Sequence, residues 1–139
     1  MPICKPYAPH FAEIAELERL YKLTGDRRLE EEKFRIIHGD KAENEVAWYL
    51  DQSAALRDFA IFHGLRLRRS DGQVAQVDHL LIHPTRLVIA IETKHVKHKI
   101  RIDDYGEFCT LRSGGGDRFY WDGMPSPLSQ GARQLDIVD

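Results

Sequence analysis

Residues 74–94 read VAQVDHLLIHPTRLVIAIETK. Two apolar runs, 74–82 and 87–94, flank the turn signal HPTR at 83–86, so the segment predicts an antiparallel pair of strands. The run LVIAI at 87–91 is apolar on both of its faces. This pattern predicts a central position for the second strand in the sheet.

Three charged residues interrupt this apolar hairpin. Asp78 lies in the first strand, and Glu92 and Lys94 lie at the end of the second. Residues two apart in a strand share a face, so Glu92 and Lys94 are expected to point the same way. Charged side chains on a central strand are uncommon unless they are paired or used in chemistry.

The length of the turn decides whether Asp78 joins them. A three-residue loop pairs His83 with Leu87 and places Asp78 directly opposite Glu92, whereas a two-residue loop places them on opposite faces. In the first register the two Cβ atoms are roughly 5 Å apart. Carboxylates that close repel unless a cation lies between them, and oxygen ligands suit Mg²⁺ or Mn²⁺. Lys94 beside them could orient a water or stabilise charge on a phosphate.

Upstream of the hairpin, the spacing of apolar residues predicts three helices. The first covers residues 11–21, and a second short helix covers residues 26–37, where Gly39 is expected to end it. A third helix is expected over residues 41–52, with Asp40 as its N-cap.

Glu43 lies on the apolar face of that third helix, together with Val46, Ala47 and Leu50. A carboxylate on this face points at the sheet rather than at water, which makes it a candidate site residue. Asp40 and Glu43 also have the spacing of a capping box, so a purely structural role is an equal alternative.

The other elements complete the expected order. Arginines and leucines alternate over residues 65–68, and short strands are expected at 100–102, 108–111 and 119–121, before a last helix over 127–139. Helices, a meander of strands and a final helix predict an α+β or mixed α/β domain.

Composition excludes several classes of protein. The chain has 139 residues, is 42% hydrophobic and carries a net charge of −2, which fits one domain with a core and excludes a strongly basic nucleic-acid coat. No apolar run approaches the ~20 residues of a membrane span, and the N-terminus has no apolar leader. Two cysteines cannot build a disulfide framework. We therefore expect a soluble, cytoplasmic protein with no membrane partner.

Charge is distributed unevenly along the chain. Residues 59–101 contain eight basic and three acidic residues, whereas the segments 11–58 and 102–139 each carry a net charge of −4. A basic centre suits an anionic partner. A solvated basic face is the simpler interpretation of the charge alone.

Four blocks of sequence occur in a characteristic order. They are Gly39-x-x-Ala42-Glu43-x-x-Val46, Gln76-Val77-Asp78-His79-Leu80-Leu81, Val88-Ile89-Ala90-Ile91-Glu92-Thr93-Lys94 and Pro127-Leu128-Ser129-Gln130. Together they resemble the nuclease-related domain (NERD) family, within the superfamily of metal-dependent Asp…Glu-x-Lys (PD-(D/E)XK) nucleases. The resemblance covers about residues 36–134.

The resemblance implies an α/β fold with a mixed central β-sheet flanked by helices, a restriction-endonuclease-like core. A nuclease-related domain is expected over residues 38–139, preceded by an N-terminal helical arm over residues 1–37. The implied activity is hydrolysis of phosphodiester bonds with Mg²⁺ or Mn²⁺, and DNA is the favoured substrate.

Position by position, the resemblance assigns roles to four charged residues. Asp78 and Glu92 would be metal ligands, and Lys94 would position the attacking water. Glu43 would complete the metal shell or orient the lysine.

Four further residues are expected to contact substrate. Gln76 would line the site, and Gln130 on the last helix would contact substrate or the lysine, both by resemblance. Lys97 and Lys99 lie in a basic loop beside the site, where they fit phosphate contacts. A solvated loop is the alternative for the two lysines.

Some alternatives remain at this stage. The chain could be a binding module for nucleic acid or protein that does not cut, and the helical arm could form a homodimer. The family's last helix normally continues into another strand, which would make this chain a C-terminally truncated fragment. His79 is expected to be packed rather than to act as a base. Trp48, Tyr120 and Trp121 are expected in the core or on edge strands rather than against bases.

Overall fold

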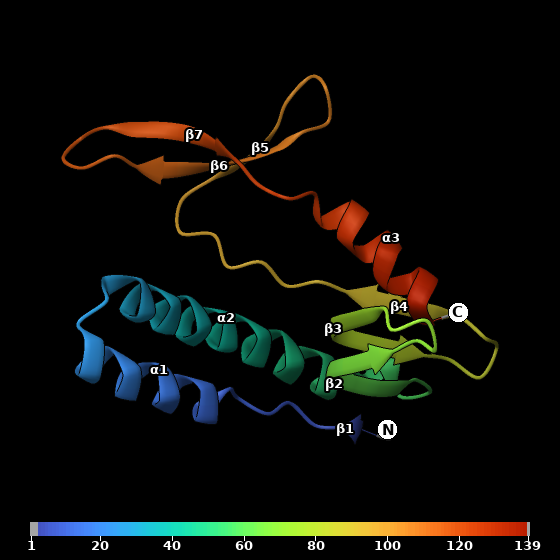
Figure 1. The fold of residues 1–139 in the computed structure, drawn as a ribbon. Coiled ribbons are helices and arrows are strands. Elements are labelled where there is room, and N and C mark those ends of the chain that lie inside the picture. Colours follow the sequence, from blue (N-terminus) through green and yellow to red (C-terminus); the bar gives the residue numbers. More distant parts are fainter. Residues whose placement is uncertain (1–2, 139) are drawn as a thin grey trace.

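Two sheets and three helices make up residues 3–138, the part of the chain that the computed structural model describes (Figure 1). In chain order the elements are β1 (Ile3–Lys5), α1 (Phe11–Thr24), α2 (Arg27–Gln52), a 3₁₀ turn η1 (Ala54–Leu56), β2 (Ala60–Arg68), β3 (Val74–Ile82), β4 (Val88–Ile91), β5 (Ile100–Ile102), β6 (Phe108–Ser113), β7 (Phe119–Gly123) and α3 (Pro127–Val138). The predicted mixed α/β class is confirmed. None of these described helices is both long enough and apolar enough to cross a membrane.

The main sheet is mixed, as expected, and has the strand order β1-β2-β3-β4. Strand β1 is parallel to β2, and the other neighbours are antiparallel. The middle strands β2 and β3 supply the fully buried side chains Ile61, Val77, Leu80 and Leu81. The core therefore lies against the two middle strands of the main sheet.

Strand β4 lies at the edge of the main sheet and not at its centre, so that prediction was wrong. Its apolar run is explained by α3, which packs against both β3 and β4 (Figure 1). All four of its residues are half-buried. The strand ends at Ile91, so Glu92 and Lys94 follow it instead of lying inside it.

The turn between β3 and β4 has the three-residue loop that brings Asp78 opposite Glu92. Ile82 pairs with Val88, and the His83 backbone N–H donates to the carbonyl of Leu87 at 2.9 Å. Arg86, the last residue of the loop, has φ of +67°. This left-handed conformation is what a three-residue hairpin requires, although it favours glycine.

The predicted helical arm, residues 1–37, takes in α1 and the first part of α2, and these two helices pack as a hairpin (Figure 1). Helix α1 ends at Gly25, whose φ of +67° closes the helix with a bond to the carbonyl of Tyr21. Asp26 then caps α2, because its carboxylate accepts a hydrogen bond from the Arg28 backbone N–H at 3.0 Å.

Helix α2 runs without interruption through Gly39, so the predicted break between two helices was wrong. A helical glycine costs about 1 kcal/mol relative to alanine, which tertiary contacts can outweigh. Asp40 is not a cap. It is buried, and its carboxylate accepts hydrogen bonds from the Tyr7 hydroxyl and the His10 backbone N–H, both at 2.8 Å. The capping-box explanation of Glu43 is therefore wrong as well.

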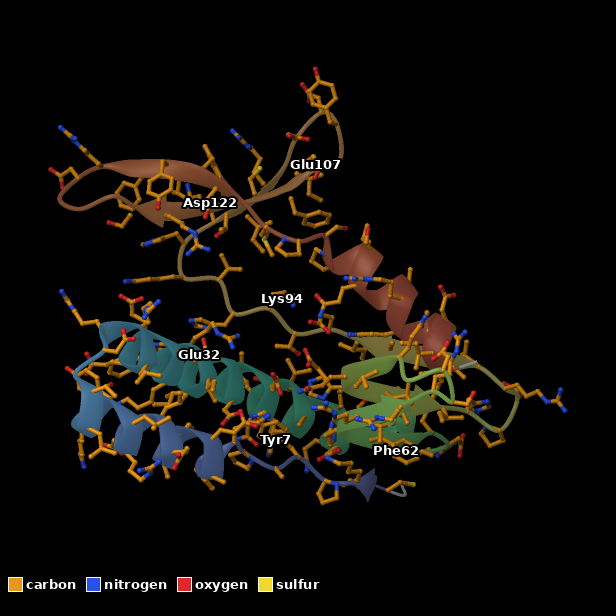
Figure 2. The ribbon with its side chains drawn as sticks, in the orientation of Figure 1. Tyr7, Glu32, Phe62, Lys94, Glu107 and Asp122 are labelled. Atoms are coloured by element: carbon orange, nitrogen blue, oxygen red, sulfur yellow. The ribbon has the colours of Figure 1, made fainter. Side chains whose placement is uncertain are left out.

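Strands β5, β6 and β7 form a separate antiparallel sheet that stands away from the main one (Figure 1). None of its residues is buried. The chain segment 92–99 joins the two sheets, and Figure 2 labels Lys94 on this linker. The short strands were expected, but their separation into a second sheet was not.

Replacing Arg86 with glycine should stabilise the protein by about 0.5–1 kcal/mol, because the left-handed conformation costs a non-glycine residue about 1–2 kcal/mol and part of that is offset by the freer unfolded chain. The measurement is the free energy of unfolding in urea. Gly72→Ala is the matched control, since Gly72 has φ of +88° and open space around a Cβ. It should destabilise the protein. No gain from Arg86→Gly would mean that the arginine side chain makes a compensating contact.

Candidate functional site

Asp78 and Glu92 are brought together by the β3–β4 register. The ladder ends at the pair His79–Ile91, and Asp78 and Glu92 are the next residues in the same register. Asp78 is buried, and its Oδ2 accepts a hydrogen bond from the Thr93 backbone N–H at 2.8 Å. The first residues after β4 are therefore tied to the carboxylate of β3.

The Glu92 carboxylate is held by three side-chain donors. Lys94 Nζ donates to Oε1 at 2.5 Å, and Gln130 Nε2 donates to the same oxygen at 2.7 Å. Gln134 Nε2 donates to Oε2 at 2.9 Å. Only a tenth of the Glu92 side chain is exposed. Helix α3 thus fixes both oxygens of a nearly buried carboxylate.

Gln134 is a site residue that the sequence analysis missed. Its Nε2 also donates to the carbonyl of Gln76 at 2.9 Å, and its buried Oε1 has no hydrogen-bond partner among the described residues. A signal was present, because Gln130 and Gln134 are four residues apart and so share one face of a helix. The resemblance ended at about this residue and named only Gln130.

Glu43 projects from α2 toward the two carboxylates. Burial, reinforced by the charge of Asp78, raises the pKa of Glu43 to about 7. Burial also raises the pKa of Asp78 to about 6. The charge of Glu92 raises this pKa further, whereas the hydrogen bond from the Thr93 N–H lowers it. Three carboxylates from two structural layers therefore face a common region and repel one another.

This set of three carboxylates could hold a divalent cation. All three donors are hard oxygens, which suit Mg²⁺ or Mn²⁺. A cation would offset the burial and the mutual repulsion that raise the pKa of Glu43 and of Asp78. Within residues 3–138, no three His, Cys, Asp or Glu side chains already converge on a single point. In this structure Lys94 is the cation that Glu92 contacts.

The remaining expected contact residues divide into two groups. Gln76 lines a hollow of about 310 Å³ on the Glu43 side of the site. Lys97 lines a second hollow of about 480 Å³, which also includes Lys94. Lys99 is exposed and is not part of either hollow; its carbonyl accepts a hydrogen bond from the Leu111 N–H.

A buried chain of polar side chains lies behind the site. The Asp51 carboxylate contacts His63 Nε2 at 2.8 Å, and the Nδ1 atoms of His63 and His79 lie 2.8 Å apart. His79 Nε2 contacts the hydroxyl of Thr93 at 3.1 Å. Both histidines are fully buried, and burial lowers the pKa of His79 to about 4. His79 is packed, as predicted, and it supports the residue that holds Asp78.

A comparison with protein families finds one match. Residues 38–139 match the model described as Nuclease-related domain (NERD). The matched segment includes β2 to β7, helix α3 and the part of α2 from residue 38 onward. Every residue of the candidate site lies within it. No curated protein and no solved structure matches the chain.

Glu43→Gln should stabilise the protein at pH 8 and have little effect at pH 5, in buffer with EDTA. Because the folded state raises the pKa of Glu43 from 4.5 to about 7, its favourable contribution exists below pH 4.5 and is lost as the pH rises through about 7. We expect a gain of about 1–2 kcal/mol at pH 8, after allowance for solvent screening of a half-buried group. Urea unfolding at both pH values measures it, and an equal effect at both would contradict the raised pKa.

His63→Leu should lower the free energy of unfolding by about 2–3 kcal/mol, because it leaves His79 and Asp51 without their shared partner. His83→Leu is the control, since the His83 side chain lies in the β3–β4 turn, where it bonds the nearby Thr85 and its ring packs against Phe59, and leucine can keep the apolar part of that contact. Its effect should be below about 1 kcal/mol. Equal losses in the two variants would show that the buried chain adds nothing to stability.

Proposed function

Because the chain belongs to the nuclease-related domain family, we propose that it is a metal-dependent nuclease that hydrolyses phosphodiester bonds, with DNA as the favoured substrate. One observation carries the proposal: Asp78 and Glu92 face each other across the β3–β4 ladder, with Glu43 beside them and Lys94 bonded to Glu92. A cluster of like charges that is partly buried is costly to a fold, which supports a chemical use.

Glu43, Asp78 and Glu92 are the residues proposed to hold Mg²⁺ or Mn²⁺. Their oxygens are partly or largely buried, so few waters compete for them. When bound, such a metal polarises a phosphate oxygen and lowers the pKa of a coordinated water. The protein's own contribution is to keep Asp78 and Glu92 at adjoining positions of β3 and the linker, with Glu43 close enough to feel their charge.

Lys94 is proposed to act on the substrate side. Its ammonium group is bonded to Glu92, yet a third of its side chain is exposed and lines the 480 Å³ hollow. From this position it could orient the attacking water and stabilise negative charge that develops on the phosphate. Gln130 and Gln134 would act indirectly, because they hold the Glu92 carboxylate in place.

A binding module and a homodimer are two further possibilities for this chain. A module that binds nucleic acid or protein without cutting is the rival of the nuclease. A homodimer through the helical arm is consistent with exposed Phe11 and Leu23 on α1. Size-exclusion chromatography with light scattering would test the dimer.

Lys94→Ala and Asp78→Asn should each reduce plasmid nicking in Mg²⁺ or Mn²⁺ by about 10²-fold or more, because each removes a group that acts on the reacting phosphate or its metal. Asparagine keeps an oxygen that can accept the Thr93 N–H, so the fold is preserved. EDTA should abolish nicking by the wild-type protein.

Lys22→Ala is the control, because Lys22 lies in the last turn of α1, and this variant should cut normally. Circular dichroism confirms that each variant is folded. Undiminished nicking by folded Lys94→Ala would contradict the assignment. A folded wild-type protein that binds DNA in EDTA but cuts neither plasmid nor single-stranded DNA in Mg²⁺ or Mn²⁺ would favour the binding module.

A further inference from the structure

A basic hollow adjoins Lys94, between the linker and the second sheet. It has a volume of about 480 Å³, within the usual range for ligand sites. We call it the basic hollow, and its polar lining comprises Lys94, His95, Lys97, His98, Thr110, Arg112, Ser113 and Tyr120. No carboxylate lies in the described lining, although Glu92 and Asp122 outside it pair with Lys94 and Arg112. The lining itself, with Lys97 and two histidines besides, favours an anion.

Both walls of the basic hollow are anchored. On the linker side, the ring of His95 stacks on His38 of α2, with centroids 5.1 Å apart and an interplanar angle of 6°. On the sheet side, Arg112 Nε donates to Asp122 Oδ2 at 2.6 Å across β6 and β7. Figure 2 labels Asp122 on β7 above the linker that carries Lys94.

Exposed aromatic rings accompany these basic groups. Tyr120 lines the basic hollow and is 51% exposed. Its neighbours on the edge strand β7 are Phe119, 53% exposed, and Trp121, 39% exposed, and the Arg101 guanidinium lies 4.4 Å from the centroid of the Trp121 ring. Tyr120 and Trp121 do lie on an edge strand, as expected, but their rings remain open to solvent.

The opposite side of the site has the reverse charge. The 310 Å³ hollow beside Glu43 also contains Glu13, Glu32 and Asp40. Its only Lys or Arg in the described lining, Arg35, is already paired with Glu32. This acidic hollow would repel a nucleic-acid strand laid across it.

We propose that the basic hollow binds an unpaired segment of DNA, with one base stacked on Tyr120 and the adjacent phosphates on Lys97 and Arg112. The inference rests on the proposed function and names its substrate class. Stacking on a side chain requires a base that is free of its own helix. In a duplex each base is stacked and paired within the helix, so it could reach Tyr120 only after the pair opens. Stacking on Tyr120 therefore selects against paired DNA, and the described lining of the acidic hollow offers a second strand no unpaired lysine or arginine.

Binding in EDTA tests this inference without any cleavage. A fluorescein-labelled oligonucleotide of about a dozen nucleotides is compared with the same strand in a blunt duplex, by fluorescence anisotropy on the whole chain. We expect the single strand to bind at least about tenfold more tightly. Duplex binding of equal or greater strength, or no binding of the single strand, would overturn the inference.

Two variants locate the contact. Tyr120→Ala should weaken single-strand binding about fivefold to a hundredfold, whereas Tyr120→Phe keeps the stacking ring and should bind normally. Tyr105→Ala is the matched control, because Tyr105 is 92% exposed in the β5–β6 turn outside the basic hollow. Equal effects of Tyr120→Ala and Tyr105→Ala would overturn the stacking assignment.

Lys97→Ala provides an independent readout on a surface side chain. It should lower the slope of log K against log salt by about 0.7 for the single strand, as expected for one lost phosphate contact. An unchanged slope would remove Lys97 from the contact. Single-strand binding without cleavage in Mg²⁺ or Mn²⁺ would refute only the nuclease, whereas cleavage with no preference for unpaired DNA would refute only this inference.

Discussion

The candidate site depends on one hairpin turn, because the number of residues between β3 and β4 decides which side chains share a face. With three residues in the turn, Asp78 lies across from Glu92. One residue more or fewer would send one carboxylate to the opposite face of the sheet. Arg86 adopts the left-handed conformation that this turn demands. The closeness of the two carboxylates thus follows from the backbone conformation of a turn several residues away.

The rest of the fold compensates for burying these charges. Helix α3 brings two glutamines to Glu92, and the Thr93 N–H serves Asp78. Glu43 comes from the other structural layer, where burial and neighbouring charge raise its pKa. Each carboxylate is therefore held by an element that also has a structural task. The site is built into the packing of helices on the sheet and is not confined to loops.

Local patterns were sufficient to predict the hairpin from the sequence, since strand periodicity acts over a few residues. The sequence left its register open between a three-residue and a two-residue turn, and the structure shows the three-residue turn. Local patterns also located β3 at residues 74–82 and the last helix from Pro127. The continuity of α2 could not be predicted, because Asp40 is satisfied by Tyr7 and His10, some thirty residues earlier in the chain. The edge position of β4 and the separate second sheet likewise depend on long-range packing that no local pattern encodes.

The unbroken course of α2 has a mechanical consequence. A helix of 26 residues is about 39 Å long and behaves as a stiff rod. Its outer half packs against α1, and its inner half carries Glu43 toward the sheet. Since the rod has no joint at Gly39, any force that tilts the outer half also moves the Glu43 carboxylate. The position of the outer half of α2 and of α1 is consequently coupled to the position of Glu43, and through it to the geometry of the charged site.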